Sequence, residues 1–402
     1  MKKFNLQKRK FLDLLLKTIC YVSSIFSMLF LFLFLLVIGI KGFDGLFTTK
    51  IRVDLLIPVA TASKEQQIID YNDLIYKSVI KTSKTMINMS ELNVVISLEA
   101  PYQVYDQLVS HPEYLGHEHS FWISASANVY KYFNTHTNVV LEDNVERLIK
   151  GLIKQEYVAN FFNWQFFTNS DSSEPEIAGI GGSILGSMMM ISICMGFAFP
   201  LGLITAIYLE EFVPKSFITK FIEVNINNLA AVPSIVFGLL GITIFIAISN
   251  LPRSSALVGG LTLAILVLPI IVSTTRQALS TVPISIKDAA LALGASKLQI
   301  IFHHSLPIAL PTIVTGTILA ISRALGETAP LIIIGMAAFI TKIPHGIFDP
   351  ATALPVQIYL WADNPDGMFT EKASLAIVVL LLMLSVINFV AIFVRKKYSV
   401  NL

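Results

Sequence analysis

The chain has 402 residues, of which 54% are hydrophobic and 14% are charged, and its mean hydropathy is +0.69. A composition this apolar excludes an ordinary soluble domain and indicates an integral membrane protein in contact with lipid. The net charge of only +2 gives no signal for a nucleic-acid partner, and none is expected.

A basic N-terminus precedes the first apolar segment, residues 20–40. A secretory signal peptide also begins with basic residues, but its apolar region is shorter, roughly 7–15 residues, and ends at a small-residue cleavage site. Here 21 residues run up to Lys41, and about 20 are needed to cross a bilayer. We interpret residues 1–40 as a cytoplasmic N-terminus followed by a retained transmembrane helix.

Further apolar stretches of sufficient length follow along the chain. They are residues 183–209, 228–249, 256–275, 311–340 and 373–394. The stretch 311–340 contains Arg323 and the run from Gly326 to Pro330, so we expect a kink or a break there. The sequence therefore predicts an all-α integral membrane protein with six transmembrane helices, and a transmembrane domain over residues 181–402.

The orientation of these spans follows from positive charge, because loops rich in Lys and Arg stay in the cytoplasm. The N-terminus, the short loops after the second and fourth spans, and the C-terminal run Arg395-Lys396-Lys397 are all basic. With six spans these segments share one side. We therefore predict a multi-pass protein of a bacterial inner membrane with both termini in the cytoplasm, and with residues 41–180 and 341–372 outside.

Residues 41–180 differ in character from the rest of the chain. They carry 11 Lys and Arg against 17 Asp and Glu, and they are long enough for a small domain. Ile51 to Leu55 alternates apolar and polar residues as a half-buried strand does. Ser63 to Gln66 fits a capping box before a helical pattern, and Leu141 to Val158 repeats that pattern. We expect an extracytoplasmic (periplasmic) mixed α/β insert domain.

An aromatic series closes this insert. Its members are Phe161, Phe162, Trp164, Phe166 and Phe167. Such residues suit a membrane interface or the core of the insert, and the sequence leaves both interpretations open.

The loop from Lys287 to Pro311 is the strongest local pattern. Ala289 to Leu293 are strong helix formers, Gly294 can end that helix, and a second helical stretch begins at Lys297. We expect a short helix–turn–helix on the cytoplasmic face that inserts into a groove on a partner. A plain interfacial loop between two spans is the alternative.

This loop resembles the EAA loop of ABC-importer permeases. The resemblance rests on the spacing of the acidic residue, the two alanines, the glycine and the Leu-Pro pair, here Asp288, Ala289, Ala290, Gly294, Leu306 and Pro307. It implies that these residues form an ATPase-coupling loop within residues 276–310. Asp288 stands where Glu is usual, and His304 stands where an apolar residue is usual. Asp288 keeps the negative charge that a helix N-terminus favours.

A narrower resemblance covers residues 178–395. It rests on the runs YLEEF (208–212), NINNLAAVPSIVFG (225–238) and RALGETAP (323–330). These runs are similar to those of the PstA family, the permease subunits of phosphate ABC importers, and the N-terminal third resembles an extra region found on some members. The resemblance implies transport of inorganic phosphate. It also implies three partners: a second, PstC-like permease, a PstB-like ATPase dimer and a periplasmic PstS-like phosphate-binding protein.

Arg323 and Glu327 carry the chemistry of the fifth span. An ionisable group inside a membrane is costly and marks a functional site by default. The two residues are four apart, so their side chains can meet, and a guanidinium matches the oxygens of phosphate. We predict a substrate pathway at Arg323, Glu327 and the neighbouring Thr328. The alternative is a structural ion pair that never meets the solute.

Absent motifs complete the prediction. No G-x-x-x-x-G-K-[ST] run occurs, so ATP hydrolysis is assigned to a separate subunit and the chain is expected not to be an enzyme. No metal-ligand or nucleophile–base pattern stands out, and neither a cofactor nor a metal is predicted. The alternatives are an ABC permease for molybdate, sulfate or an amino acid, a membrane sensor that reads an external ligand, and a secondary transporter or channel.

Overall fold

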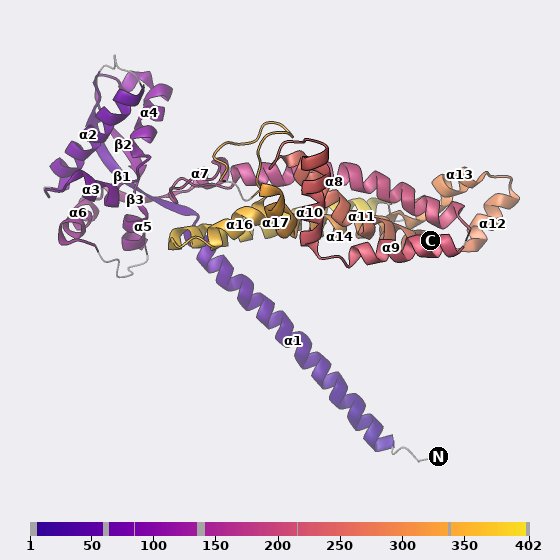
Figure 1. Cartoon of the computed structure of the whole chain (residues 1–402). Coiled ribbons are helices and arrows are strands. Elements are labelled where there is room, and N and C mark those ends of the chain that lie inside the picture. The colour runs from indigo at the N-terminus through magenta and orange to yellow at the C-terminus, as the bar shows by residue number, and fades with distance from the viewer. Residues whose placement is uncertain are drawn as a thin grey trace.

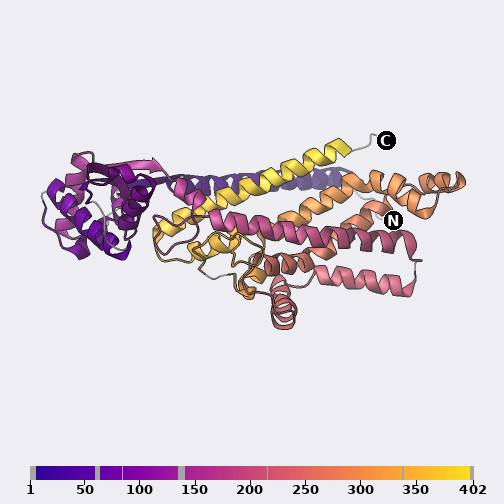
Figure 2. The same ribbon diagram turned by 90° about the horizontal axis from the view of Figure 1, so that it is seen from above.

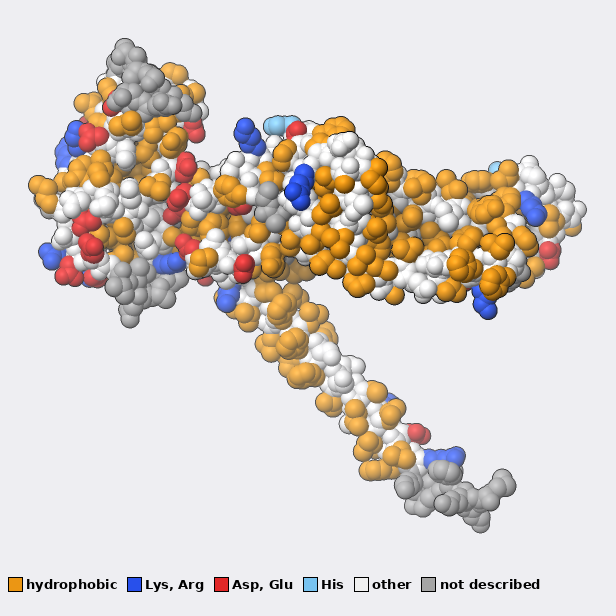
Figure 3. Space-filling model, viewed as in Figure 1, with side chains coloured by type: hydrophobic (Ala, Val, Ile, Leu, Met, Phe, Trp, Pro, Cys, Tyr) orange, Lys and Arg blue, Asp and Glu red, His pale blue; other side chains and the backbone are white. Residues whose placement is uncertain are grey.

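The computed structural model describes residues 6–58, 64–83, 85–134, 141–214, 216–336 and 339–398. The molecule is elongated, with an insert domain at one end and a helical bundle that extends to the other (Figure 1). Apolar side chains dominate the visible surface of the bundle and of α1, whereas charged side chains gather on the insert and at the far end of the bundle (Figure 3). This distribution fits a bundle surrounded by lipid.

The insert is built from β1 to β3 with short helices around them. Its elements are β1 (Phe47–Leu56), α2 (Lys64–Ser83), α3 (Met89–Val95), α4 (Ala100–Ser110), β2 (Glu118–Ser124), α5 (Ala127–Asn134), α6 (Asp143–Lys154), β3 (Val158–Phe162) and α7 (Trp164–Thr168). The strands form an antiparallel sheet in the order β2-β1-β3. The predicted alternation in β1 is present, because Ile51, Val53 and Leu55 are buried in the core between sheet and helices.

The helix predicted after the first strand is α2, and the one predicted over 141–158 is α6, which is shorter. Ser63, the first residue of the capping box predicted at Ser63 to Gln66, lies outside the described residues. Residues 169–180 contain no helix or strand before α8 begins.

The remaining elements form the bundle. They are α1 (Leu6–Asp44), α8 (Gly181–Ile207), η2 (Tyr208–Phe212), α9 (Phe217–Ala230), α10 (Ser234–Gly241), η3 (Ile242–Ile248), α11 (Ala256–Ser280), α12 (Ile284–Ala292), α13 (Lys297–Ile300), η4 (Ile301–Ser305), α14 (Leu306–Gly326), α15 (Ala329–Leu331), η5 (Ile332–Met336), α16 (Leu354–Ala362) and α17 (Gly367–Tyr398). Helix α11 is central and packs against α8, α14, α10 and α9. Helix α1 contacts α17 near the insert and then diverges from the bundle (Figure 1).

Five described helices are long and apolar enough to cross a membrane: Arg9–Asp44, Gly181–Phe212, Ala256–Ser280, Lys297–Gly326 and Gly367–Lys397. A sixth span exists only if the bent pair of helices Phe217–Ala230 and Ser234–Ile248, which meet at 99°, counts as one.

Two spans differ from their predicted form. The stretch 228–249 is not one straight helix, because Pro233 lies at the bend and a proline disfavours helical backbone in the residue before it. The fifth span begins well before 311, since α13 continues through the π-helical turn η4 into α14. The predicted loop 276–310 is therefore helical over much of its length, with Pro307 in the turn that follows η4.

Candidate functional site

The fifth span breaks where the sequence predicted. Helix α14 ends at Gly326, and Glu327 has extended backbone with φ −80° and ψ 125°. The Arg323 Nε atom donates to Glu327 Oε1 at 3.4 Å, so the predicted partners do meet. Because the helix has ended, they meet across its C-terminus and not along one helical face. The change of backbone direction at the break thus directs the Glu327 carboxylate toward the Arg323 guanidinium.

Helix α10 packs against the chain just after this break. A Cβ added to Gly238 would lie 2.9 Å from the Pro330 Cα atom and 3.0 Å from its carbonyl oxygen. Only a glycine lets the two backbones approach so closely. Two of the three runs that carry the phosphate-permease resemblance are therefore in direct contact, and Gly238 packs against the segment that holds Glu327 and Thr328.

The charged pair is not sealed inside the chain. The Arg323 side chain is 37% exposed and that of Glu327 is 19% exposed. The contact with Glu327 uses Nε, and a guanidinium carries further N–H donors that match two oxygens of an anion at once. The geometry therefore allows Arg323 to meet a group outside this chain while Glu327 orients it.

The predicted helix–turn–helix is present at the end of the bundle opposite the insert (Figure 1). Helix α12 is followed by Gly294 with φ +82°, a conformation that L side chains rarely adopt. Ser296 then caps α13 in a capping box with Gln299. Asp288 and Ala289 are exposed on α12, whereas Ala290 is buried.

Apolar side chains project from this loop. Leu293 is 90% exposed, and Leu291 and Leu298 are about half exposed. Leu306 instead packs into the core formed with α11 and α14, and Pro307 is partly buried beside it. His304 is exposed, so its departure from the usual apolar residue disturbs no packing within this chain. Exposed leucines at the end of a loop suit insertion into a groove.

A network of charges at the same end was missed by the sequence analysis. Lys287 Nζ donates to Glu211 Oε1 at 2.7 Å, and the two side chains are only 22% and 11% exposed. Arg276 Nη2 lies 3.4 Å from Glu210 Oε2, and Arg276 Nη1 lies 3.4 Å from Glu223 Oε1. The carboxylates Glu210 and Glu211 lie in the π-helical turn that ends α8, so one turn holds both α11 and α12.

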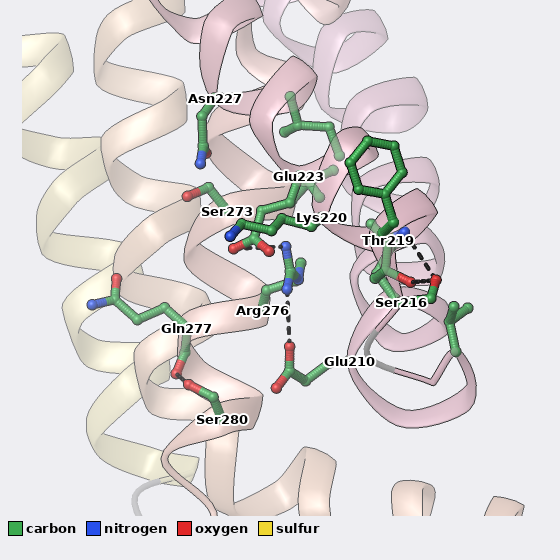
Figure 4. Close-up of a pocket in the computed structure, with 15 residues that line it drawn as sticks. Glu210, Ser216, Thr219, Lys220, Glu223, Asn227, Ser273, Arg276, Gln277 and Ser280 are labelled. Carbon is green, nitrogen blue, oxygen red and sulfur yellow. Dashed lines mark hydrogen bonds and ion pairs between the residues drawn. The ribbon is translucent and has the colours of Figure 1, made fainter.

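A cavity of ≈ 780 Å³ opens beside Arg276 between η2, α9 and α11. Figure 4 shows Arg276 between Glu210 and Glu223, with Lys220, Gln277 and Ser280 around it. The YLEEF run had been singled out, but no spacing rule links Glu210 or Glu211 to basic residues 66 and 76 positions later. These contacts could not be found without the tertiary structure.

Within the described residues, no group of three or more His, Cys, Asp or Glu side chains is placed to hold a metal ion. The candidate functional site comprises two charged regions: the helix break at Arg323 and Glu327, and the ion-pair network around Glu210 and Glu211.

Comparison with known proteins identifies the class. Residues 198–398, half of the chain, match the family described as binding-protein-dependent transport system inner membrane component. The chain belongs to this family, whose members are membrane components of transport systems and not enzymes. Residues 3–143 match a domain of unknown function, DUF3333.

Several individual relatives of this chain are phosphate transport system permease proteins. The phosphate transport system permease protein PstA of Yersinia pestis is 33% identical over 222 residues, which cover 55% of this chain and 74% of that protein. PstA 1 of Mycobacterium tuberculosis H37Rv is 34% identical, covering 54% and 70%. The probable ABC transporter permease YqgI of Bacillus subtilis is 32% identical, covering 53% and 76%. A solved structure of the methionine ABC transporter MetNI aligns at 18% identity with a TM-score of 0.44, over 54% of this chain and 95% of that one.

Proposed function

We propose that this chain is the permease subunit of an ATP-binding-cassette importer that carries inorganic phosphate across the bacterial inner membrane. The observation that supports this most is the Arg323–Glu327 pair at a helix break within an apolar bundle, on a chain whose relatives include phosphate permeases. The partners of such a chain would be a PstC-like permease, a PstB-like ATPase dimer and a PstS-like phosphate-binding protein.

The proposed topology places residues 1–40 and 181–402 as the membrane part and residues 41–180 as the extracytoplasmic insert. It is supported by the arrangement of the molecule, because the insert and the α12–α13 loop lie at opposite ends of the bundle (Figure 2). The basic last turn of α17, with Arg395, Lys396 and Lys397, points away from the insert and belongs in the cytoplasm.

The proposed pathway runs past Arg323, Glu327 and Thr328. Arg323 supplies paired N–H donors for the phosphate oxygens. Glu327 holds the guanidinium between transport events and repels a fully charged anion, so that a protonated phosphate is favoured. Because the Arg323 side chain is partly exposed on the surface of this chain, the second permease completes the pathway around it.

The proposed coupling runs through α12. Leu291 and Leu293 enter a groove on the ATPase, whose closure on ATP moves Asp288 to Gly294. Lys287 passes this movement to Glu211 and hence to the end of α8, while Arg276 ties α11 to the same turn. The spans then alternate between outward and inward access.

Transport by the reconstituted complex tests the proposed substrate. Proteoliposomes that contain this chain with its co-expressed importer subunits should take up labelled phosphate only when ATP is present. Excess unlabelled phosphate should compete, and sulfate, molybdate and amino acids should not. Competition by one of these solutes and not by phosphate would assign the chain to another substrate, and uptake without ATP would remove it from the ABC class.

The topology has a matched pair of reporters. Leu56 in the insert is 64% exposed and Leu293 in the α12–α13 loop is 90% exposed. In intact spheroplasts a membrane-impermeant maleimide should label a Leu56→Cys variant and leave Leu293→Cys unlabelled. In inside-out vesicles from cells that lack the partner ATPase, so that no subunit covers the loop, the order should reverse, and the opposite pattern would invert the proposed topology.

A further inference from the structure

Aromatic rings form a continuous patch where α1 passes into the insert. We call Phe43, Phe47, Phe162 and Trp164 the outer aromatic patch. The ring centroids of Phe43 and Phe47 are 5.6 Å apart, and Phe47 pairs with Phe162 across β1 and β3. The Phe162 and Trp164 rings follow at 4.9 Å. The patch therefore joins the last turn of a membrane helix to the edge of the insert.

The patch is open to its surroundings. Trp164 is 70% exposed, Phe43 60% and Phe162 42%. Phe166, from the same aromatic series, is instead fully buried against Trp361 and Phe369. Phe166 therefore lies in a core that it shares with α16 and α17 of the bundle, and not in the core of the insert, whereas Phe162 and Trp164 face outward.

The surface of α1 indicates what covers the patch. This helix has a mean hydropathy of 2.6 over its most apolar window, of which 6% is buried, so lipid must surround it. Phe43 lies three residues past Ile40, the end of the apolar run, which is roughly 4–5 Å at 1.5 Å per residue. The interfacial layer on each side of the hydrocarbon core is roughly 5–8 Å thick. Phe43 and the rings that adjoin it therefore fall at the depth of the lipid headgroups.

The chemistry of the patch suits that depth. An indole has a large apolar face and one N–H donor, and such rings collect at the boundary between hydrocarbon and water. Lys41 lies on the last turn of α1 and is exposed, so its ammonium can reach lipid phosphates at the same level. Apolar rings and a neighbouring cation are what a headgroup layer accepts.

We infer that the outer aromatic patch rests in the headgroup layer of the bilayer and holds the edge of the insert against the membrane surface. The insert is thus positioned by lipid as well as by the bundle. This inference rests on the proposed membrane function, but it is independent of the solute and of which face the insert occupies.

Spin-label depth measurements on the full chain in lipid nanodiscs test the inference. In a Cys20→Ser background, Trp164→Cys would carry a nitroxide, and its collision rates with oxygen and with a water-soluble nickel chelate would be compared. Phe30→Cys, in the middle of α1, is the reference for hydrocarbon. Leu56→Cys is the aqueous reference, because nine residues of β1 at roughly 3.3 Å each separate it from Phe47.

The depth parameter at position 164 should fall between those of positions 30 and 56. A value equal to that at 56 would place the patch in water, and low collision rates with both reagents would show that protein covers it; either result overturns the inference.

A second measurement, by fluorescence quenching, leaves the native Trp164 side chain in place. Headgroup-proximal brominated lipids should quench the fluorescence of the unmodified chain more than that of Trp164→Phe, and equal quenching would contradict lipid contact. Neither result depends on phosphate transport, so a failure here is distinct from a failure of the proposed function.

Discussion

The two charged regions of the bundle pair similar groups but are built differently. Arg323 and Glu327 are four residues apart, and their contact at 3.4 Å is made by a local break in the chain. Lys287 and Glu211 are 76 residues apart, and their contact at 2.7 Å is more buried. The local pair is partly exposed on this chain, whereas the non-local pair joins the turn after α8 to α12. In the proposed function, the first pair recognises the solute and the second transmits movement.

This difference has an energetic side. A partly exposed pair on one segment stabilises the fold little, so in the proposed function Arg323 exchanges Glu327 for an anion at small cost. A more buried pair is costly to leave half-made, because the remaining charge loses its partner in a poorly hydrated place. Changes at Arg323 should therefore affect transport with little effect on assembly, and changes at Lys287 should affect the link between helices.

The largest effect is expected for Arg323→Gln, which removes the charge but keeps much of the length. Phosphate uptake by the assembled complex should be lost, because the positive charge and the guanidinium fork that match the anion are removed. Uptake of labelled phosphate is the measurement, with co-purification of the other subunits as the check on assembly. Arg323→Lys keeps the charge without the fork and should retain partial uptake. Normal uptake by Arg323→Gln would make the pair purely structural.

The next largest effect concerns the turn that presents the exposed leucines. Gly294 has φ +82°, and a Cβ added there would have open space around it, so a substitution acts through the backbone alone. Gly294→Val should cost roughly 1–2 kcal/mol of backbone strain, reorient α12 and abolish co-purification of the ATPase. Gly294→Asn is the matched control, since asparagine tolerates this conformation. Equal ATPase recovery with both variants would count against docking at this turn.

A smaller effect tests the non-local pair. Lys287→Glu would place like charges at the 2.7 Å contact and should raise the ATP hydrolysed per phosphate transported severalfold. The combined Lys287→Glu and Glu211→Lys variant should restore much of the coupling, because the pair is re-formed with reversed sign. Lys297→Glu, an exposed lysine on the same loop, is the control and should change little. A double variant no better than the single one would argue against transmission through this contact.

The smallest effect is expected where the insert meets the bundle. Glu176 Oε1 accepts from the Ala127 amide at 2.6 Å, and burial raises the pKa of Glu176 to about 7. An unfolded chain would release this proton near its usual pKa of 4.5. Between these values only the folded state holds the proton, so the contribution of Glu176 to stability falls as pH rises from about 4.5 to about 7.

Thermal unfolding of the detergent-solubilised chain at pH 5 and pH 8 checks this expectation. The chain should lose more stability between the two pH values than its Glu176→Gln variant does, since glutamine cannot ionise. Equal losses would show that the carboxyl does not titrate in this range.

Local patterns were read correctly from the sequence because their partners are close along the chain. The turn at Gly294, the alternation in β1 and the break after Gly326 each depend on fewer than ten neighbouring residues. The bend at Pro233 could also be predicted from the sequence, because a proline inside an apolar run indicates a bend. The length of the run instead favoured one straight span.

The sequence by itself determined that this is a membrane protein with a helix–turn–helix loop at Gly294 and an arginine–glutamate pair in one span, because composition and short spacing carry that information. Only the tertiary structure decided that Glu211 holds Lys287, that Gly238 packs against Pro330, and that Phe166 is buried while Trp164 faces outward. The physical reason is that each of these outcomes depends on packing between elements far apart in the chain, and no periodicity in the sequence records which side chains such packing brings together.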